Sequence, residues 1–95
     1  MKRRIALKLA RELESGKWKK ARAKLGRGQR QRCCLGVLQE IAPSRLPRSS
    51  LIEYYPSEAV IEWAGMRSDE AADLADMNDT SRGWAKVIKL LRETK

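Results

Sequence analysis

CCLGVLQEI, residues 33–41, is the most hydrophobic run in the sequence and sets its fold class. Cys34, Leu38 and Ile41 share one helical face with Val37 beside them, a spacing that predicts a buried helix. Gly36 lies inside this run, where it costs about 1 kcal/mol of helix propensity relative to alanine. Close approach of another element would be one reason for a glycine at this position.

The two cysteines in this run are expected to be core residues. Neighbouring cysteines rarely form a disulfide, and reduced thiols are the default in a cytosolic protein. Free cysteine is among the most buried residue types. The alternative is a reactive thiol at Cys33 or Cys34, activated by the charges of Arg30 and Arg32.

Apolar stripes at helical spacing continue on both sides of this run. Ile5, Leu9 and Leu13 predict a first helix that ends at Ser15-Gly16. After the linker between Pro43 and Pro47, further helices are predicted to begin at Pro56-Ser57, ending at Gly65, and at Ser68. A turn at 78–80 then leads to a last helix capped by Thr80 or Ser81, with an apolar face of Trp84, Val87, Ile88 and Leu91.

Residues 17–32 fit two structures. Trp18, Ala21 and Leu25 share one helical face, which favours a short helix over 18–25. The alternative is an extended basic arm or hairpin over 17–32, with Gly26 and Gly28 supplying the bend. The expected fold is mainly α: a single small domain over 1–95 with four or five short helices, comprising a basic N-terminal third (1–32) and a helical core (33–95).

Positive charge is concentrated at one end of the chain. Residues 1–32 hold 13 of the 21 Lys and Arg residues and only two acids, whereas residues 33–95 hold eight basic and ten acidic residues. The first third is therefore +11 and the remainder −2. Such asymmetry is typical of proteins that bind a polyanion, either nucleic acid or a nucleotide-derived ligand.

The basic segment supplies the candidate binding residues. Lysine and arginine side chains that neutralise phosphates release counterions, which gives affinity independent of sequence. Trp18 is expected either to stack on a base or to pack in the core through its shared face with Ala21 and Leu25. The candidates are Arg3, Arg4, Lys17, Trp18, Lys19, Lys20, Arg22, Lys24, Arg27, Arg30 and Arg32.

A second candidate lies in residues 70–92, which have the helix, short turn and helix of a helix-turn-helix. A reading helix that began at Ser81 would present Arg82, Lys86 and Lys89 to a DNA groove. The acids of the preceding helix oppose this function, and an ordinary pair of packed helices is the simpler interpretation.

The sequence offers little for catalysis. It has no histidine, no phosphate-binding glycine loop, and too few cysteines for a tetrahedral metal site. Asp69, Glu70, Asp73 and Asp76 are expected to form a solvated acidic face. We expect no enzyme activity, cofactor or metal. No apolar run approaches the roughly 20 residues of a membrane span, and no cleavable targeting peptide is evident. The chain is expected to be cytoplasmic, in a bacterial host cell.

Several short motifs resemble a group of small, largely uncharacterised phage and prophage proteins. The resemblance spans most of residues 7–92 and rests on Lys17-Trp18, CCLGVL at 33–38, VIEWAG at 60–65, and Leu74 followed by Asn78-Asp79. In that group an EWAGL-like segment and an LND turn precede a final helix. The present chain lacks the group's long polar insertion, has Gln39 where another cysteine is frequent, and is far more basic at its start.

The resemblance implies a phage-type origin and fold but no reaction. Small phage proteins that counter host defence commonly act by occlusion, which needs no active site. The leading hypothesis is a non-catalytic phage-type protein, similar in role to anti-CRISPR inhibitors. Its basic third would engage nucleic acid or occlude a host nucleoprotein complex. The alternative is a helix-turn-helix DNA-binding accessory or regulatory protein that uses residues 70–92.

Overall fold

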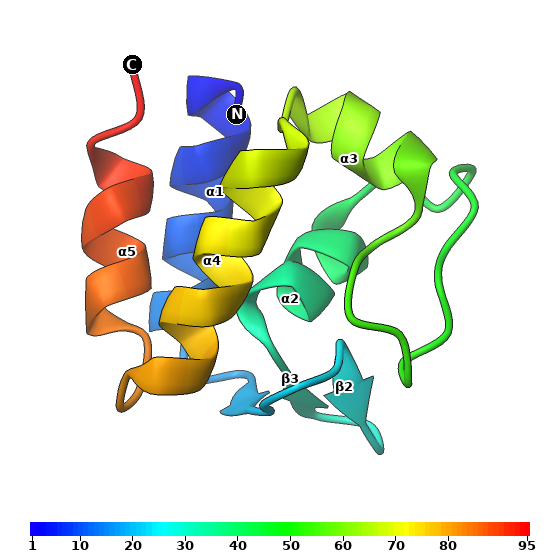
Figure 1. Ribbon diagram of the computed structural model, residues 1–95, viewed down its shortest axis with the longest axis horizontal. Coiled ribbons are helices and arrows are strands. Elements are labelled where there is room, and N and C mark those ends of the chain that lie inside the picture. Colours follow the sequence, from blue (N-terminus) through cyan, green and yellow to red (C-terminus); the bar gives the residue numbers. More distant parts are fainter.

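Five helices and a small three-stranded sheet make up the computed structural model, which describes residues 1–95 (Figure 1). The mainly α fold class is confirmed, and about half of the residues are helical. The elements in chain order are α1 (Arg3–Glu14), β1 (Lys19–Lys20), β2 (Gly26–Arg27), β3 (Gln31–Arg32), α2 (Cys34–Ile41), α3 (Glu58–Ala64), α4 (Ser68–Thr80) and α5 (Ala85–Arg92).

Helix α2 is buried, as predicted, and lies at the centre of the core. Every residue from Cys33 to Gln39 is buried, and α2 packs against both α1 and α4, while α5 packs against α1 and α4. Helix α5 lies beside α1, and α4 packs on α2 and α5, with the sheet at the lower end of the helices (Figure 1). The core side chains come from all five helices, and Leu25 joins them from the segment before β2.

Local signals predicted several helix boundaries correctly. The Ser57 hydroxyl accepts a hydrogen bond from the Val60 N–H at 3.2 Å and so caps α3. Gly65 ends α3 in a left-handed conformation with φ +66°. Helix α4 begins at Ser68, but its N-cap is Arg67, one residue earlier than the cap predicted at Ser68, and the carboxylate of Glu70 accepts the Arg67 backbone N–H at 3.1 Å.

The helix predicted over 18–25 is wrong, and the extended alternative is correct: β2 and β3 form a short hairpin, and β1 pairs with β3 in parallel. The N–H groups of Lys19 and Ala21 donate to the carbonyls of Arg30 and Arg32, each at 2.8 Å. Ala23 has φ +64°, which no right-handed helix accommodates. The apolar residues have helical spacing, but the backbone N–H groups of Lys19 and Ala21 donate to carbonyls about ten positions later in the chain. In a helix they would donate to carbonyls four positions earlier.

The turn predicted at 78–80 is also wrong. Helix α4 continues to Thr80, and the break covers residues 81–84 instead. Asn78 stays helical because its side chain, which could have formed a turn, makes long-range hydrogen bonds. The last helix therefore begins at Ala85, with Trp84 as its N-cap, and neither Thr80 nor Ser81 caps it. Val87 and Leu91 are buried as expected.

Candidate nucleic-acid interface

The small sheet presents two rows of side chains on opposite faces. Strand β3 is central, with β1 parallel and β2 antiparallel to it. Because successive side chains on a strand point to opposite faces, the register separates an outer row from an inner row. The outer row is exposed or half-buried and contains Lys19, Gln31 and Arg27; the inner row is half-buried or buried and contains Lys20, Arg32 and Gly26.

The outer row forms the centre of a cationic surface. Neighbouring strands lie about 4.8 Å apart, so Lys19 and Arg27 flank Gln31 at a separation of about 10 Å between their Cα atoms. Arg30 lies in the turn between β2 and β3, and its carbonyl accepts the Lys19 N–H at 2.8 Å. Lys17 precedes β1. We call Lys17, Lys19, Arg27, Arg30 and Gln31 the cationic platform.

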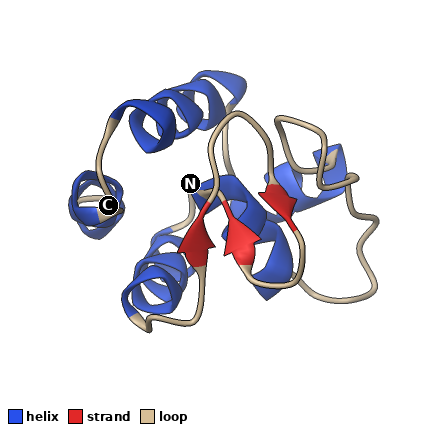
Figure 2. Ribbon diagram, turned by 90° about the horizontal axis from the view of Figure 1, so that it is seen from below, coloured by secondary structure: helices blue, strands red, loops and turns tan.

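The cations of the platform are almost free of acidic partners. Lys19, Arg27 and Arg30 form no ion pair, and their side chains donate no hydrogen bond within the chain. Lys17 lies 3.7 Å from Glu12, but its side chain is 63% exposed, where an ion pair contributes little. Residues 15–32 contain no acid at all. The sheet lies in front of the helices when the molecule is seen from below (Figure 2).

The neighbouring cations Lys20 and Arg22 have a structural use. Lys20 Nζ donates to the carbonyls of Ser81 and, at 2.8 Å, Gly83. Arg22 donates to the carbonyls of Asp79 and Ser81, both at 3.3 Å. Burial, followed by the charge on Arg22, lowers the pKa of Lys20. These two side chains satisfy carbonyls at the C-terminus of α4, which favours positive charge.

Trp18 and Arg32 also belong to the packed structure. The Trp18 ring is half-buried against the core, and its Nε1 donates to Glu12 Oε1 at 3.0 Å. Arg32 is only 6% exposed, and its guanidinium lies 5.3 Å from the centre of that ring. Arg32 also donates to the carbonyls of Gly28 and Gln31 at 2.8 Å. Core packing is therefore the better description of Trp18 than free stacking.

The remaining predicted cations do not join one surface. Lys24 is half-buried beside β2, without an ion pair. Arg3 and Arg4 start α1, whose 12 residues put them about 18 Å from the end that leads to the sheet. Arg3 donates to the carbonyl of Thr94 at 2.8 Å. The structure thus groups the central part of the basic third and separates its start.

The predicted reading helix differs from the observed one. Arg82 lies in the connection between α4 and α5 and not on a helix, because α5 begins only at Ala85. Lys86 and Lys89 are exposed on α5. Lys86 lines a hollow together with Asp73 and Asp76. A DNA phosphate at Lys86 would therefore meet two carboxylates.

The cysteines are buried, as predicted. Cys33 Sγ accepts the Gly36 N–H at 3.3 Å and caps α2, while Cys34 Sγ lies 3.6 Å from the carbonyl of Leu74. Burial raises the pKa of both thiols. The thiolate needed for nucleophilic attack is thus disfavoured at both positions.

We expect native protein to react with a disulfide-exchange reagent only as fast as it unfolds, since neither sulfur is accessible. Absorbance of the released thiol would follow the reaction, and the same protein in denaturant should release two equivalents. Immediate labelling of native protein would contradict the burial of these side chains.

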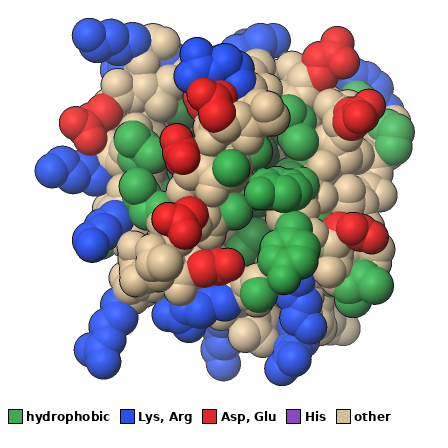
Figure 3. Space-filling model, viewed as in Figure 1, with side chains coloured by type: hydrophobic (Ala, Val, Ile, Leu, Met, Phe, Trp, Pro, Cys, Tyr) green, Lys and Arg blue, Asp and Glu red, His purple; other side chains and the backbone are tan.

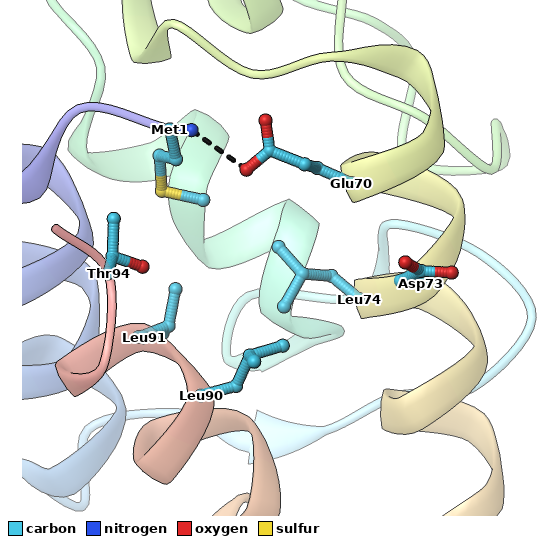
Figure 4. Close-up of a pocket in the computed structure, with 7 residues that line it drawn as sticks. All are labelled: Met1, Glu70, Asp73, Leu74, Leu90, Leu91 and Thr94. Atoms are coloured by element: carbon cyan, nitrogen blue, oxygen red, sulfur yellow. Dashed lines mark hydrogen bonds and ion pairs between the residues drawn. The ribbon is translucent and has the colours of Figure 1, made fainter.

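The hollow at the start of the chain contains none of the predicted binding residues. It has a volume of about 170 Å³ and lies between α4, α5 and the start of the chain (Figure 4). The Met1 ammonium donates to Glu70 there at 2.8 Å. Burial opposes the charge of Glu70, but this ammonium and the Arg67 N–H outweigh it and lower its pKa.

A metal site and a membrane-spanning helix would also be visible in the structure. No group of three or more His, Cys, Asp or Glu residues is arranged to hold a metal ion. No helix combines the length and the apolar character needed to cross a membrane.

The sequence did not draw attention to two features near the platform. Gln31 lies at its centre, but a glutamine between arginines carries no signal of its own. The loop with Ile52, Tyr54 and Tyr55 carries no sequence-based prediction, although it holds both tyrosines of the chain and leaves them exposed. Adjacent aromatic residues outside any apolar stripe were the available clue.

Comparisons with protein-family models, curated proteins and solved structures found no match.

Proposed function

We propose that this protein is a non-catalytic nucleic-acid-binding protein and that the cationic platform is its interface. The observation that carries the proposal is the exposed outer face of the sheet, where Lys19, Arg27 and Arg30 lie together without acidic partners. Unpaired cations repel one another, and a chain that keeps them together usually has a polyanionic partner. The buried, protonated cysteines and the lack of histidine support a role without catalysis.

The chemistry of the platform favours contacts with phosphates over recognition of base edges. Its flexible Lys and Arg side chains project from a short sheet and a turn, and no helix is presented for insertion into a groove. Phosphate contacts position a protein but carry no sequence information. We therefore expect binding without strong sequence preference and with a steep dependence on salt concentration.

Replacing Lys17, Lys19, Arg27 and Arg30 together with glutamine should abolish most nucleic-acid binding at moderate salt. Loss of about four phosphate contacts should reduce the slope of log affinity against log salt by about three. Fluorescence anisotropy of a labelled oligonucleotide over a salt series measures both effects. All four side chains are exposed, so the melting temperature should barely change.

A matched variant replaces Arg4, Lys8, Lys86 and Lys89 with glutamine. It removes the same charge from exposed positions on α1 and α5, away from the sheet. It should keep most of the affinity and most of the salt slope. If this variant loses binding while the platform variant keeps it, the platform is not the interface. The alternative centred on residues 70–92 would then be favoured.

A further inference from the structure

The loop that follows α2 exposes a cluster of large apolar side chains next to the sheet. Ile52 is 73% exposed, Tyr54 60% and Tyr55 43%. These are three of the four large hydrophobic residues that the molecule exposes. Aromatic rings left in water cost free energy, and contiguous exposed apolar groups commonly mark an interaction site.

Hydrogen bonds fix this loop against the start of β2. The N–H of Leu25 donates to the carbonyl of Glu53 at 2.8 Å, and that of Gly26 donates to the carbonyl of Leu51 at 3.1 Å. The two segments run in opposite directions, so Tyr54 lies toward Lys24 and Arg27 lies toward Ser50. The loop therefore follows the outer edge of β2, the strand that carries Arg27, and adjoins the cationic platform along that edge.

A hollow continues from the loop toward the helices. It measures about 350 Å³, and Tyr55 lines it together with Pro56, Glu58, Ile61, Ser68 and Ala71. Figure 3 shows hydrophobic side chains gathered in the middle of this face, with Lys and Arg side chains along its lower edge. Acidic side chains lie to the left of the apolar area, where α4 runs (Figures 1 and 3).

The cationic platform and the hollow at Tyr55 differ in charge and therefore suit different parts of a ligand. The platform offers cations without acids, which suits phosphates. The hollow contains the carboxylate of Glu58 and no cation, so phosphates are disfavoured there. Aromatic rings and an apolar wall suit the faces of bases, since every base has a face that stacks.

We propose that the nucleic acid is single-stranded, with its phosphates on the cationic platform and its bases stacked on Tyr54 and Tyr55. This proposal rests on the proposed function and names its ligand more closely. In a duplex the faces of the bases are stacked on one another, so a duplex reaches the platform but offers nothing to the tyrosines. A single strand uses both areas at once.

The test compares a labelled oligothymidylate of about 16 nucleotides, the upper end of common site sizes, with a duplex of the same length. Binding of each is followed by fluorescence anisotropy for the wild type, Tyr54→Ala, Tyr55→Ala, Tyr54→Phe and Arg27→Gln. The wild type should prefer the single strand. Each alanine variant should bind the single strand about 5- to 150-fold more weakly, corresponding to 1–3 kcal/mol per stacked base, and should bind the duplex unchanged.

The remaining variants separate stacking from charge. Tyr54→Phe keeps the ring and should bind like the wild type. Arg27→Gln should weaken both ligands and reduce the salt slope by about one. If the alanine variants bind the single strand as well as the wild type, or if the wild type prefers the duplex, the single-strand proposal fails while the proposed function stands. If the wild type binds neither ligand, the proposed function itself fails.

Discussion

Gly36→Ala is expected to lower the free energy of unfolding by about 2 kcal/mol, although alanine is the better helix former. A Cβ atom at Gly36 would lie 2.0 Å from the carbonyl oxygen of Leu25 and 2.9 Å from its carbon. Both are backbone atoms of a buried residue. Helix propensity would return about 1 kcal/mol, but overpacking a core costs about 1–3 kcal/mol and sometimes more.

The Leu25 carbonyl cannot easily move away. It accepts the N–H of Cys33 at 2.9 Å, and the N–H of Leu25 donates to Glu53. A shift that relieved the clash would break hydrogen bonds that hold β2 on α2 and the tyrosine loop on β2. For a domain whose total stability is about 5–15 kcal/mol, the loss should be plain in urea denaturation followed by circular dichroism.

Gly16→Ala is the control for this substitution. A Cβ atom there meets nothing within 4 Å, and only the left-handed backbone, with φ +78°, opposes it. That conformation costs about 1–2 kcal/mol for a residue with a side chain. A Gly36→Ala midpoint equal to that of the wild type would mean that Leu25 does not lie against α2.

Asn78→Ala should be more destabilising, by about 3–5 kcal/mol, because Asn78 joins three separate segments. It is fully buried on α4. Its Oδ1 accepts the Cys34 N–H at 3.0 Å and the Trp84 Nε1–H at 3.1 Å. Its Nδ2 donates to the Ala21 carbonyl at 2.9 Å and to Asp79 at 3.1 Å. Truncation leaves buried backbone groups unpaired, at about 1–3 kcal/mol each.

Asn78→Asp tests the donor side of the amide separately. It keeps the size and both acceptor contacts but replaces the donor with a second carboxylate oxygen facing the Ala21 carbonyl and Asp79. It should therefore destabilise the protein at neutral pH about as much as alanine does. Thr80→Ala is the control, since its hydroxyl is exposed and donates only to Asp76 within α4. A loss below about 1 kcal/mol for both Asn78 variants would contradict this hydrogen-bond network.

The sequence predicted those parts of the fold whose causes lie within a few residues. The stripe through Ile5, Leu9 and Leu13 gave α1, the CCLGVL run gave α2, and Ser57 and Gly65 bounded α3. Even the close approach at Gly36 could be expected, because a glycine inside a buried helix needs a packing reason. The concentration of charge in the first third was equally visible without a structure.

Prediction failed where backbone partners are distant. Residues 18–25 have a helical spacing of apolar side chains, but Lys19 pairs with Arg30 and Leu25 pairs with Glu53. Asn78 resembled a turn residue, yet its amide bonds to Ala21 and Cys34, more than 40 positions earlier. No local pattern encodes such partners.

The same division holds for the candidate site. The sequence by itself determined that the protein carries a dense, acid-free run of cations, because charge follows from composition alone. Only the tertiary structure decided which cations are available. The C-terminal carbonyls of α4 engage Lys20 and Arg22, and Trp18 covers Arg32. The pleat of the sheet turns Lys19 and Arg27 outward, since alternate residues of a strand face opposite sides and only the partners across the strands determine which side meets water.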